Sequence, residues 1–239
     1  MRPRTVRILL RSMEDVAVLR TPTWWTQTHT LDILVSIATL TLIAIAWIVV
    51  LRRRVWQQTK ALRASEERLR HLSEHDVRTN LPNRVLLNDR LTMALQRAER
   101  FKQILGILMV DVDRFKEVND SYGHHVGDKL LCELAKRISH SVRLTDTVAR
   151  FGGDEFIILL PDLHERRQAQ AIAAKIVAAI FVPFLIGPAH LPISVTVSVG
   201  VCTYPEAGLD REILLQHIDS AMYSMKAQGR DGFQVYKPD

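Results

Sequence analysis

The longest apolar run of the chain lies near its N-terminus. Residues 33–51 (ILVSIATLTLIAIAWIVVL) are 19 consecutive positions without a charge, about the length that crosses a hydrocarbon core of roughly 30 Å. A buried core helix is one alternative. A signal peptide is another, but it usually has a shorter apolar region at the start of the chain. We therefore predict a transmembrane helix over residues 31–51.

Basic residues flank this run unevenly. Arg52, Arg53 and Arg54 follow it directly, whereas Arg20 is the closest Lys or Arg before it. Because Lys and Arg collect on the cytoplasmic side of a membrane span, we expect the C-terminal part of the chain in the cytoplasm. The protein would then be a single-pass protein of the inner (cytoplasmic) membrane. Residues 1–30 would be a short extracytoplasmic segment, which we interpret as the remnant of a sensor domain.

Residues 52–75 are rich in helix formers and are expected to form a connecting helix. Val55, Leu62 and Leu69 are seven residues apart, which is the spacing of one seam position in a coiled coil. Polar Gln58 and Ser65 occupy the alternate seam positions. Two interpretations therefore remain, a weak coiled coil that pairs two copies of the chain and a solvated helix that only connects its neighbours.

Beyond residue 75 the apolar positions alternate between helical and strand spacing, with Gly and Pro at the boundaries. Residues 76–239 are therefore expected to form one domain, an α/β (α+β) sandwich of helices around a single sheet. Helical patterns occupy residues 84–101, 126–142, 165–181 and 211–227, and strand patterns occupy residues 104–112, 147–151, 155–160, 193–202 and 233–236.

The charge distribution limits the partners of this domain. The chain has a net charge of +6, but residues 1–72 hold 12 Lys and Arg against 5 Asp and Glu, which leaves 20 against 21 for residues 73–239. A near-neutral domain without a basic run interleaved with aromatics argues against binding long DNA or RNA. Cys132 and Cys202 fit no zinc or redox spacing and are interpreted as buried thiols.

A glycine-rich segment between two strand patterns carries candidate chemistry. Residues 150–156 (RFGGDEF) are typical of a β-hairpin, because Gly-Gly tolerates positive φ in the turn. Taken alone, such an acidic hairpin is usually a solvated turn. The strand pattern before it ends in Asp111-Val112-Asp113, where alternation places both aspartates on one face. If the hairpin lies beside that strand end, carboxylate and carbonyl oxygens meet there, and these are the ligands that Mg²⁺ prefers.

Four motifs in order resemble the signatures of GGDEF-family diguanylate cyclases. They are DVDRFKEVNDSYGHHVGDKLL at 111–131, RFGGDEF at 150–156, SVGV at 198–201 and AMYSMKAQGRDG at 221–232. The segment HDVRTNLPNR (75–84) resembles the entry motif of the family, but departs from it at VRTN, where a leucine and a glycine are usual. The resemblance implies a five-stranded, largely antiparallel sheet flanked by helices. It also implies that two GTP molecules are condensed into cyclic di-GMP with release of two pyrophosphates.

The resemblance assigns catalytic roles to five residues. Asp111, the backbone oxygen of Val112 and Asp154 resemble the ligands of the metal, Mg²⁺ or Mn²⁺. Asp154 is also the expected acceptor of the proton of the 3′-hydroxyl, and Glu155 is expected to be needed for activity. Lys116 matches a cation beside the triphosphate, where it would offset the charge that develops on the transferred phosphoryl group.

The resemblance also implies a substrate site. Asn119 and Asp128 match the pair that binds the edge of guanine, and His124 matches a further contact. Each has a plainer alternative: a carboxylate after a glycine can cap a helix, and surface cations are usually solvated. His124 and its neighbour do not suggest a transition-metal site, because no third soft ligand is evident. The remaining expected substrate-binding residues are Gly152, Gly153, Lys226 and Arg230.

Arg143 and Asp146 lie nine and six residues before Gly152, an offset that resembles the RxxD product site of the family. Cyclic di-GMP bound there would inhibit the enzyme allosterically. The alternative is an arginine at a helix end followed by a turn aspartate.

The proposed reaction needs two copies of the domain, because each GTP must attack the other, so the resemblance implies a homodimer. The main alternative is a catalytically silent GGDEF domain that binds GTP or cyclic di-GMP as a receptor or regulator. A membrane-anchored scaffold is a further alternative. In this family a phosphodiesterase domain often follows the cyclase domain, and it would reverse the net reaction.

Overall fold

The computed structural model of the chain describes residues 27–186 and 191–237, without the side chains of residues 61–62 and 64–67. The chain divides into two compact units, Met1–Ala64 and Ser65–Asp239. Most of the predicted extracytoplasmic segment, residues 1–30, lies outside the described residues.

Helix α1 (Gln27–Glu74) contains the predicted membrane span. Its stretch Gln27–Lys60 has a mean hydropathy of 2.7 in its most apolar window, and no part of that window is buried. Length and composition therefore suffice to cross a membrane. Of the predicted coiled-coil positions, Val55 and Leu69 are exposed. The side chains of Leu62 and Ser65 lie outside the described part, so the coiled coil stays a prediction.

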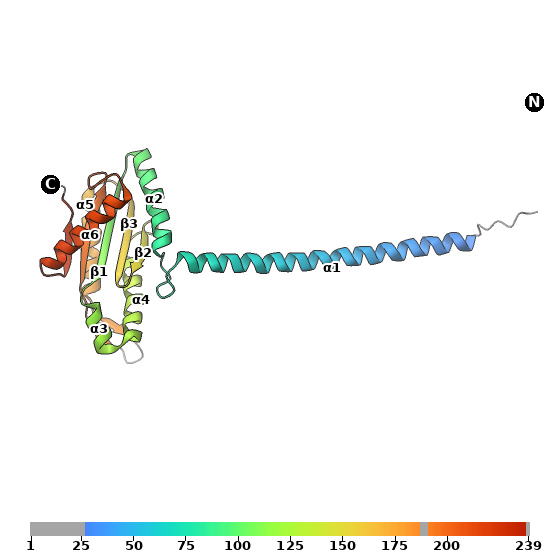
Figure 1. Ribbon diagram of the computed structural model, residues 1–239, viewed down its shortest axis with the longest axis horizontal. Helices are drawn as coiled ribbons and strands as arrows, with labels where there is room; N and C mark the ends of the chain where they lie inside the picture. The colour runs from blue at the N-terminus through green and yellow to red at the C-terminus, as the bar shows by residue number, and fades with distance from the viewer. Residues whose placement is uncertain (1–26, 187–190, 238–239) are drawn as a thin grey trace, which may run out of the picture. The chain divides into compact units, whose positions relative to one another are not determined.

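The second unit is the predicted sandwich of helices around one sheet (Figure 1). Its five strands have the order β2-β3-β1-β6-β7, and neighbours are antiparallel except β6 and β7, which are parallel. The strands are β1 (Ile104–Val112), β2 (Thr147–Gly152), β3 (Glu155–Leu163), β6 (Val197–Tyr204) and β7 (Gly232–Val235). The helices are α2 (Arg84–Phe101), α3 (Phe115–Tyr122), α4 (His124–Ser141), α5 (Arg166–Phe181) and α6 (Arg211–Ala227). This confirms the predicted fold class.

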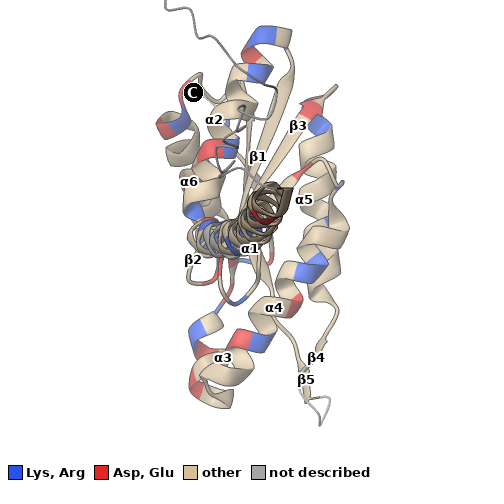
Figure 2. Cartoon of the chain, turned by 90° about the vertical axis from the view of Figure 1, so that its right-hand side faces the viewer, with Lys and Arg blue, Asp and Glu red and all other residues tan. Residues whose placement is uncertain are grey.

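The central strand β1 explains the two layers of the core. Successive side chains of a strand point to opposite faces of the sheet. Leu108 and Val110 belong to the core that includes residues of α4 and α5, whereas Ile107 and Met109 belong to the core that includes residues of α2 and α6. Figure 2 shows the same two pairs of helices on either side of the sheet. Because β1 is covered on both faces, its interior is apolar throughout, and each fully buried side chain of this size contributes roughly 1.5–3 kcal/mol.

Two predictions of secondary structure were wrong. The expected continuous strand 193–202 is two strands, because β5 (Leu191–Ile193) pairs with β4 (Phe184–Ile186) in a separate small sheet and β6 begins at Val197. Helix α3 was missed, because its eight residues are too few to show a helical period. This short helix matters for the site, since it carries Lys116 and Asn119.

The entry segment folds into a turn that is tied to the sheet. His75 bridges to Pro82, and the backbone N–H of Arg150 on β2 donates to the carbonyl of Pro82 at 2.9 Å. Asn83 then caps α2 by accepting from the amides of Val85 and Leu86. This cap fixes where the turn ends and the helix begins.

Candidate active site

The end of β1 and the hairpin between β2 and β3 lie side by side, as predicted. Asp111 is the pairing partner of Glu155, and Gly152 is paired with Glu155 across the hairpin. The loop of the hairpin is therefore Gly153 and Asp154, and Gly153 has the positive φ of 51° that the Gly-Gly pair was expected to allow. The N–H of Val112 lies 3.4 Å from the carbonyl oxygen of Asp154.

The carboxylates gathered here perturb one another. Burial is the largest cause of a raised pKa at Asp111, which the ammonium of Lys226 opposes and the charges of Asp154 and Asp113 reinforce. Burial likewise raises the pKa of Glu155, and the negative charges of Asp111 and Asp154 add to the rise. A fold that brings like charges together in a half-buried place pays an electrostatic cost, which is typical of functional sites.

Lys226 supplies the nearest positive charge. Its Nζ lies 2.8 Å from Oδ2 of Asp111, and the Asp111 side chain is only 10% exposed. Lys226 belongs to the last turn of α6, and Arg230 follows in the loop before β7. Both residues were predicted to bind the substrate, and the structure brings Lys226 to the acidic site.

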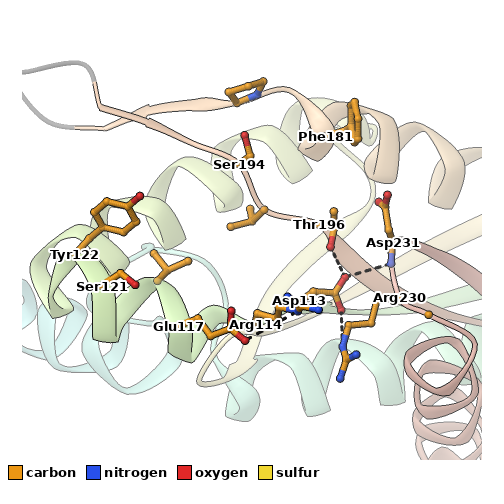
Figure 3. A pocket seen from close by; sticks show the side chains of 14 residues that line it. Asp113, Arg114, Glu117, Ser121, Tyr122, Phe181, Ser194, Thr196, Arg230 and Asp231 are labelled. Atoms are coloured by element: carbon orange, nitrogen blue, oxygen red, sulfur yellow. Dashed lines mark hydrogen bonds and ion pairs between the residues drawn. The ribbon is translucent and has the colours of Figure 1, made fainter.

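Asp113 does not share this environment, although alternation predicted one face for both aspartates. Its carboxylate accepts from the hydroxyls of Thr196 at 2.6 Å and Ser198 at 2.7 Å, and from the amide of Asp231 at 3.3 Å. Arg230 Nε lies 3.9 Å away. Figure 3 shows the contacts of Asp113 with Thr196, Asp231 and Arg230, in a pocket of about 810 Å³. Asp113 is thus a buried carboxylate with its oxygens already bonded, and it ties the loop before β7 to β6.

A second, smaller pocket of about 310 Å³ brings together the predicted guanine contacts. Asn119, His124 and Asp128 line it with Gly153 and Asp154 of the hairpin. Asn119 can occupy this place because position 127 is a glycine. A Cβ there would lie 1.9 Å from Asn119 Oδ1. The sequence therefore builds this pocket by close packing of α3 against the first turns of α4.

Arg78 is an unpredicted member of the same pocket. Its Nε lies 3.1 Å from Oδ1 of Asp128. The backbone carbonyl of Arg78 accepts from Sγ of Cys132 at 3.2 Å, one helical turn after Asp128 on α4. Arg78 belongs to the VRTN segment in which the chain departs from the usual family pattern, and that departure is the signal that could have marked it.

The tip of the hairpin is held by an ion pair that the sequence analysis also missed. Arg150 donates through Nη1 to both carboxylate oxygens of Asp76, at 2.9 and 3.0 Å, and through Nε and Nη2 to the carbonyl of Gly153, at 3.0 and 2.6 Å. The Arg150 side chain is 5% exposed. Burial alone would raise the pKa of Asp76, but bonds from Thr79 and Arg150 lower it overall. Both partners stand inside motifs already recognised, at 75–84 and 150–156.

Other predicted site residues are exposed. Lys116 lies on the solvent side of α3 and makes no hydrogen bond or ion pair with any residue of the described chain, and His124 and Arg230 are exposed as well. Gly152 and Gly153 are exposed at the hairpin, with open space where a Cβ would stand. His124 and Gly153 line the smaller pocket, and Arg230 lies beside Asp113, whereas no contact in the described part of the chain ties Lys116 to the acidic site.

The RxxD residues form a turn at the other end of β2 from the hairpin. Asp146 accepts from the amide of Arg143 at 2.7 Å, and its own amide donates to the Arg143 carbonyl at 3.1 Å. Burial raises the pKa of Asp146, while the bond and charge of Arg143 oppose the rise. The Arg143 side chain is exposed, and Leu144 beside it is fully exposed. The structure thus separates this turn from the acidic site.

The acidic site suits a hard cation, although it is not a cage of protein ligands. Within residues 27–186 and 191–237, no group of three His, Cys, Asp or Glu side chains is arranged to hold a metal ion. The predicted set needs only the carboxylates of Asp111 and Asp154 and the carbonyl of Val112. Mg²⁺ is commonly bound by one or two carboxylates, with water and phosphate in the other positions. Asp111 already draws one cation, the ammonium of Lys226.

The fold and the site together define an α/β domain with a carboxylate cluster and a polar pocket at one edge of a five-stranded sheet. Residues 73–232 match the family described as diguanylate cyclase, GGDEF domain. The chain belongs to the GGDEF family.

Several relatives are named as enzymes of cyclic di-GMP turnover. The chain is 45% identical over 212 residues to the bifunctional diguanylate cyclase/cyclic di-GMP phosphodiesterase MucR of Pseudomonas aeruginosa, covering 87% of this chain and 30% of that protein. It is 40% identical over 162 residues to the diguanylate cyclase TpbB of the same species, covering 68% of this chain and 37% of the relative. The chain therefore spans about a third of the length of these relatives.

Solved structures agree with the fold. The GGDEF domain of TpbB (YfiN) from Pseudomonas aeruginosa superposes with a TM-score of 0.66 at 39% identity, over 68% of this chain and 94% of that one. The coiled coil and GGDEF domain of DgcB from Caulobacter crescentus, solved in complex with c-di-GMP, gives a TM-score of 0.70 at 25% identity, over 77% and 98%.

Proposed function

We propose that this chain is a diguanylate cyclase, which condenses two GTP molecules into cyclic di-GMP and two pyrophosphates. One observation carries the proposal. The carboxylate of Asp111 is buried beside Asp154 and Glu155, so that the pKa values of Asp111 and Glu155 are raised, and a polar pocket for a base adjoins the cluster. Nothing in the packing of the domain requires this costly cluster, whereas phosphoryl transfer does.

In this proposal the base pocket selects guanine. The carboxylate of Asp128 accepts from the N–H donors of the guanine edge, and the amide of Asn119 supplies a further polar contact. Adenine would leave these polar groups mispaired, which is an effective way to reject a wrong base. His124 and the hairpin glycine Gly153 line the same pocket, and Gly152 stands next to Gly153 in the hairpin.

The chemistry follows from the position of the hairpin. The 3′-oxygen of one GTP attacks the α-phosphorus of the other, its proton passes to Asp154, and the bond from the α-phosphorus to the bridging oxygen of pyrophosphate breaks. Lys116, Lys226 and Arg230 offset the charge on the transferred group and on the leaving pyrophosphate. A second transfer closes the ring. The negative charge of Glu155 next to Asp154 favours the transfer of the proton to Asp154.

Asp111, Asp154 and the Val112 carbonyl would hold Mg²⁺ or Mn²⁺, which would neutralise phosphate charge and polarise the phosphorus–oxygen bonds when bound. Lys226 would then exchange its contact with Asp111 for the phosphates.

The reaction needs two domains face to face, because one GTP is bound in each. We propose a homodimer, with the helix 52–75 as the pairing element and the apolar part of α1 as a single-pass anchor in the inner membrane, which leaves the domain in the cytoplasm. Arg143 and Asp146 would bind cyclic di-GMP as an inhibitory product.

The test uses the full chain in detergent micelles with GTP and Mg²⁺. We expect pyrophosphate release and cyclic di-GMP, detected by chromatography with mass analysis. Asp154→Asn should lower turnover by roughly 100- to 10,000-fold, because it removes the proton acceptor. Asp89→Asn, on the exposed surface of α2, is the matched control and should not change turnover. A wild-type chain that binds GTP without turnover would instead be the receptor described above.

A further inference from the structure

Arg78 is a charged residue in the pocket to which the proposed function assigns guanine, and no role above explains it. Its Nε lies 3.1 Å from Oδ1 of Asp128, the carboxylate that is expected to read the base. Within the described residues, Asp128 is its only ionic partner. The side chains of Arg78 and Asp128 are 56% and 39% exposed. An ion pair so exposed adds little to stability, so stability alone gives little reason for the pair.

The chain holds Arg78 at this place from two sides. Its carbonyl is tied to Cys132 on α4 at 3.2 Å, which fixes the turn against the helix that carries Asp128. Asp76, two residues earlier, is held by the buried guanidinium of Arg150, which also holds the hairpin tip. The turn, the hairpin and α4 thus converge on one pocket, and Arg78 lines it from the side of the turn.

The chemistry of the base explains what the guanidinium can do there. Guanine presents the O6 acceptor beside its N–H donors. A carboxylate matches the donors but repels O6. Arginine has five N–H donors in a planar fork, so that a guanidinium with Nε beside Asp128 has terminal N–H groups left for a neighbouring acceptor.

We propose that Arg78 is a specificity residue of the base pocket, which pairs with Asp128 and donates a hydrogen bond to O6 of guanine. This inference rests on the proposed function, because it takes the pocket as a guanine site. Adenine carries an amino donor in place of O6, so the guanidinium would face another donor and reject it. Arg78 therefore adds an attractive contact for GTP and a repulsive one for ATP.

The experiment measures binding without turnover. The full chain in detergent micelles is titrated calorimetrically with the α,β-methylene analogue of GTP, in which the bond that must break is replaced. We expect Arg78→Leu to weaken binding of this analogue by roughly 10- to 150-fold, the range for one hydrogen bond to a charged group. Arg78→Lys keeps the charge but loses the planar fork. Its affinity for the analogue should lie between those of the wild type and Arg78→Leu. Arg167→Leu, an exposed arginine on α5, is the control for loss of one positive charge and should bind as the wild type does.

Two further nucleotides identify the atom that Arg78 contacts. The affinity of each is measured by its displacement of the α,β-methylene analogue of GTP from the protein. Inosine triphosphate keeps O6, so the loss caused by Arg78→Leu should persist. The triphosphate of 2-aminopurine riboside lacks O6, so wild type and variant should bind it within about twofold of each other. In the wild type the preference for GTP over ATP should exceed that of Arg78→Leu.

Failure of this inference is distinct from failure of the proposed function. If the wild type does not bind the GTP analogue, the proposed guanine site is wrong. If the wild type binds it and Arg78→Leu binds equally well or more tightly, the site stands and the role of Arg78 is overturned. An equal loss for the analogue without O6 would also overturn it, since the effect would then not depend on the atom proposed.

Discussion

Two carboxylates at the end of the central strand differ in what surrounds them. Asp113 is buried and accepts three hydrogen bonds, from two hydroxyls and one amide, and Arg230 Nε lies 3.9 Å from its carboxylate. Asp111, two residues earlier, is also buried, but its neighbours include two further carboxylates, and one ammonium is its compensation. One end of the strand therefore holds a satisfied charge next to an unsatisfied one.

This difference separates residues that build the fold from residues that serve a ligand. A satisfied buried carboxylate stabilises the native state, because its removal would leave donors without partners. A carboxylate held among like charges costs stability, and such a cost persists where function needs it. The comparison predicts different consequences for the same substitution, a loss of turnover at position 111 and a loss of stability at position 113.

The largest expected effect is on turnover at position 111. Asp111→Asn removes a charge that the proposed cation site needs, so we expect the rate of cyclic di-GMP formation by the full chain to fall by about 1,000-fold. The free energy of unfolding should barely change, because the loss of the contact with Lys226 is offset by the loss of repulsion from Asp154 and Glu155. Turnover is measured by pyrophosphate release, and stability by urea unfolding of the compact unit Ser65–Asp239. If turnover of the variant is near normal, Asp111 is not a residue of the active site.

The next effect is on stability at position 113. Asp113→Asn places an amide donor against three donors, from Thr196, Ser198 and Asp231, and at least one of them loses its partner. We expect the free energy of unfolding to fall by about 2 kcal/mol. Asp111→Asn is the matched control, since it makes the same chemical change two residues away. If both variants unfold at the same urea concentration, the hydrogen bonds of Asp113 do not stabilise the fold more than the contacts of Asp111 do, and the distinction is wrong.

Much of the fold was predictable because the domain follows regular periods. The apolar run 104–112 and the helical patterns after it gave the central strand and the main helices within one or two residues. Features that depend on contacts between distant parts of the chain, such as the pairing of β5 with β4 instead of its continuation into β6, were not predictable. The chain leaves the sheet at Ser194–Thr196 without a Gly or Pro there to mark the break, and α3 is shorter than the window in which a helical period shows.

The site shows the same division. The family resemblance implied that Asp111 lies beside Asp154, and the pairing of β1 with β3 brings the end of β1 to the hairpin. The sequence did not separate Asp111 from Asp113, since the hydroxyls that satisfy Asp113 come from Thr196 and Ser198, about 85 residues further on. Arg78 was visible only as a departure from a pattern. Its partner Asp128 lies on another element, and no local rule joins the two residues.

The smallest predicted effect is a difference in pH dependence, which would sharpen the comparison. The pKa values of Asp111 and Glu155 are raised in the folded domain, so the folded state binds their protons more tightly than the unfolded state does. Stability from these groups is present below the ordinary carboxyl pKa of about 4 and is lost as pH rises through the raised values. The pKa of Asp76 is lowered, so its contribution is present above about pH 4 and is lost as pH falls through the lowered value.

Urea unfolding of Ser65–Asp239 between pH 3 and pH 7, without metal or nucleotide, therefore separates the two kinds of carboxylate. The stability of the wild type relative to Asp111→Asn should decrease as pH rises, because the variant has no proton to lose at that position. Relative to Asp76→Asn it should increase over the acid part of the range, because only the wild type regains the ion pair with Arg150. Opposite slopes are the expected result, and they do not depend on any assumed reaction. Parallel curves for the two variants would mean that the crowding of charge around Asp111 is already relieved in the folded domain, and the electrostatic reason for regarding this cluster as a functional site would be lost.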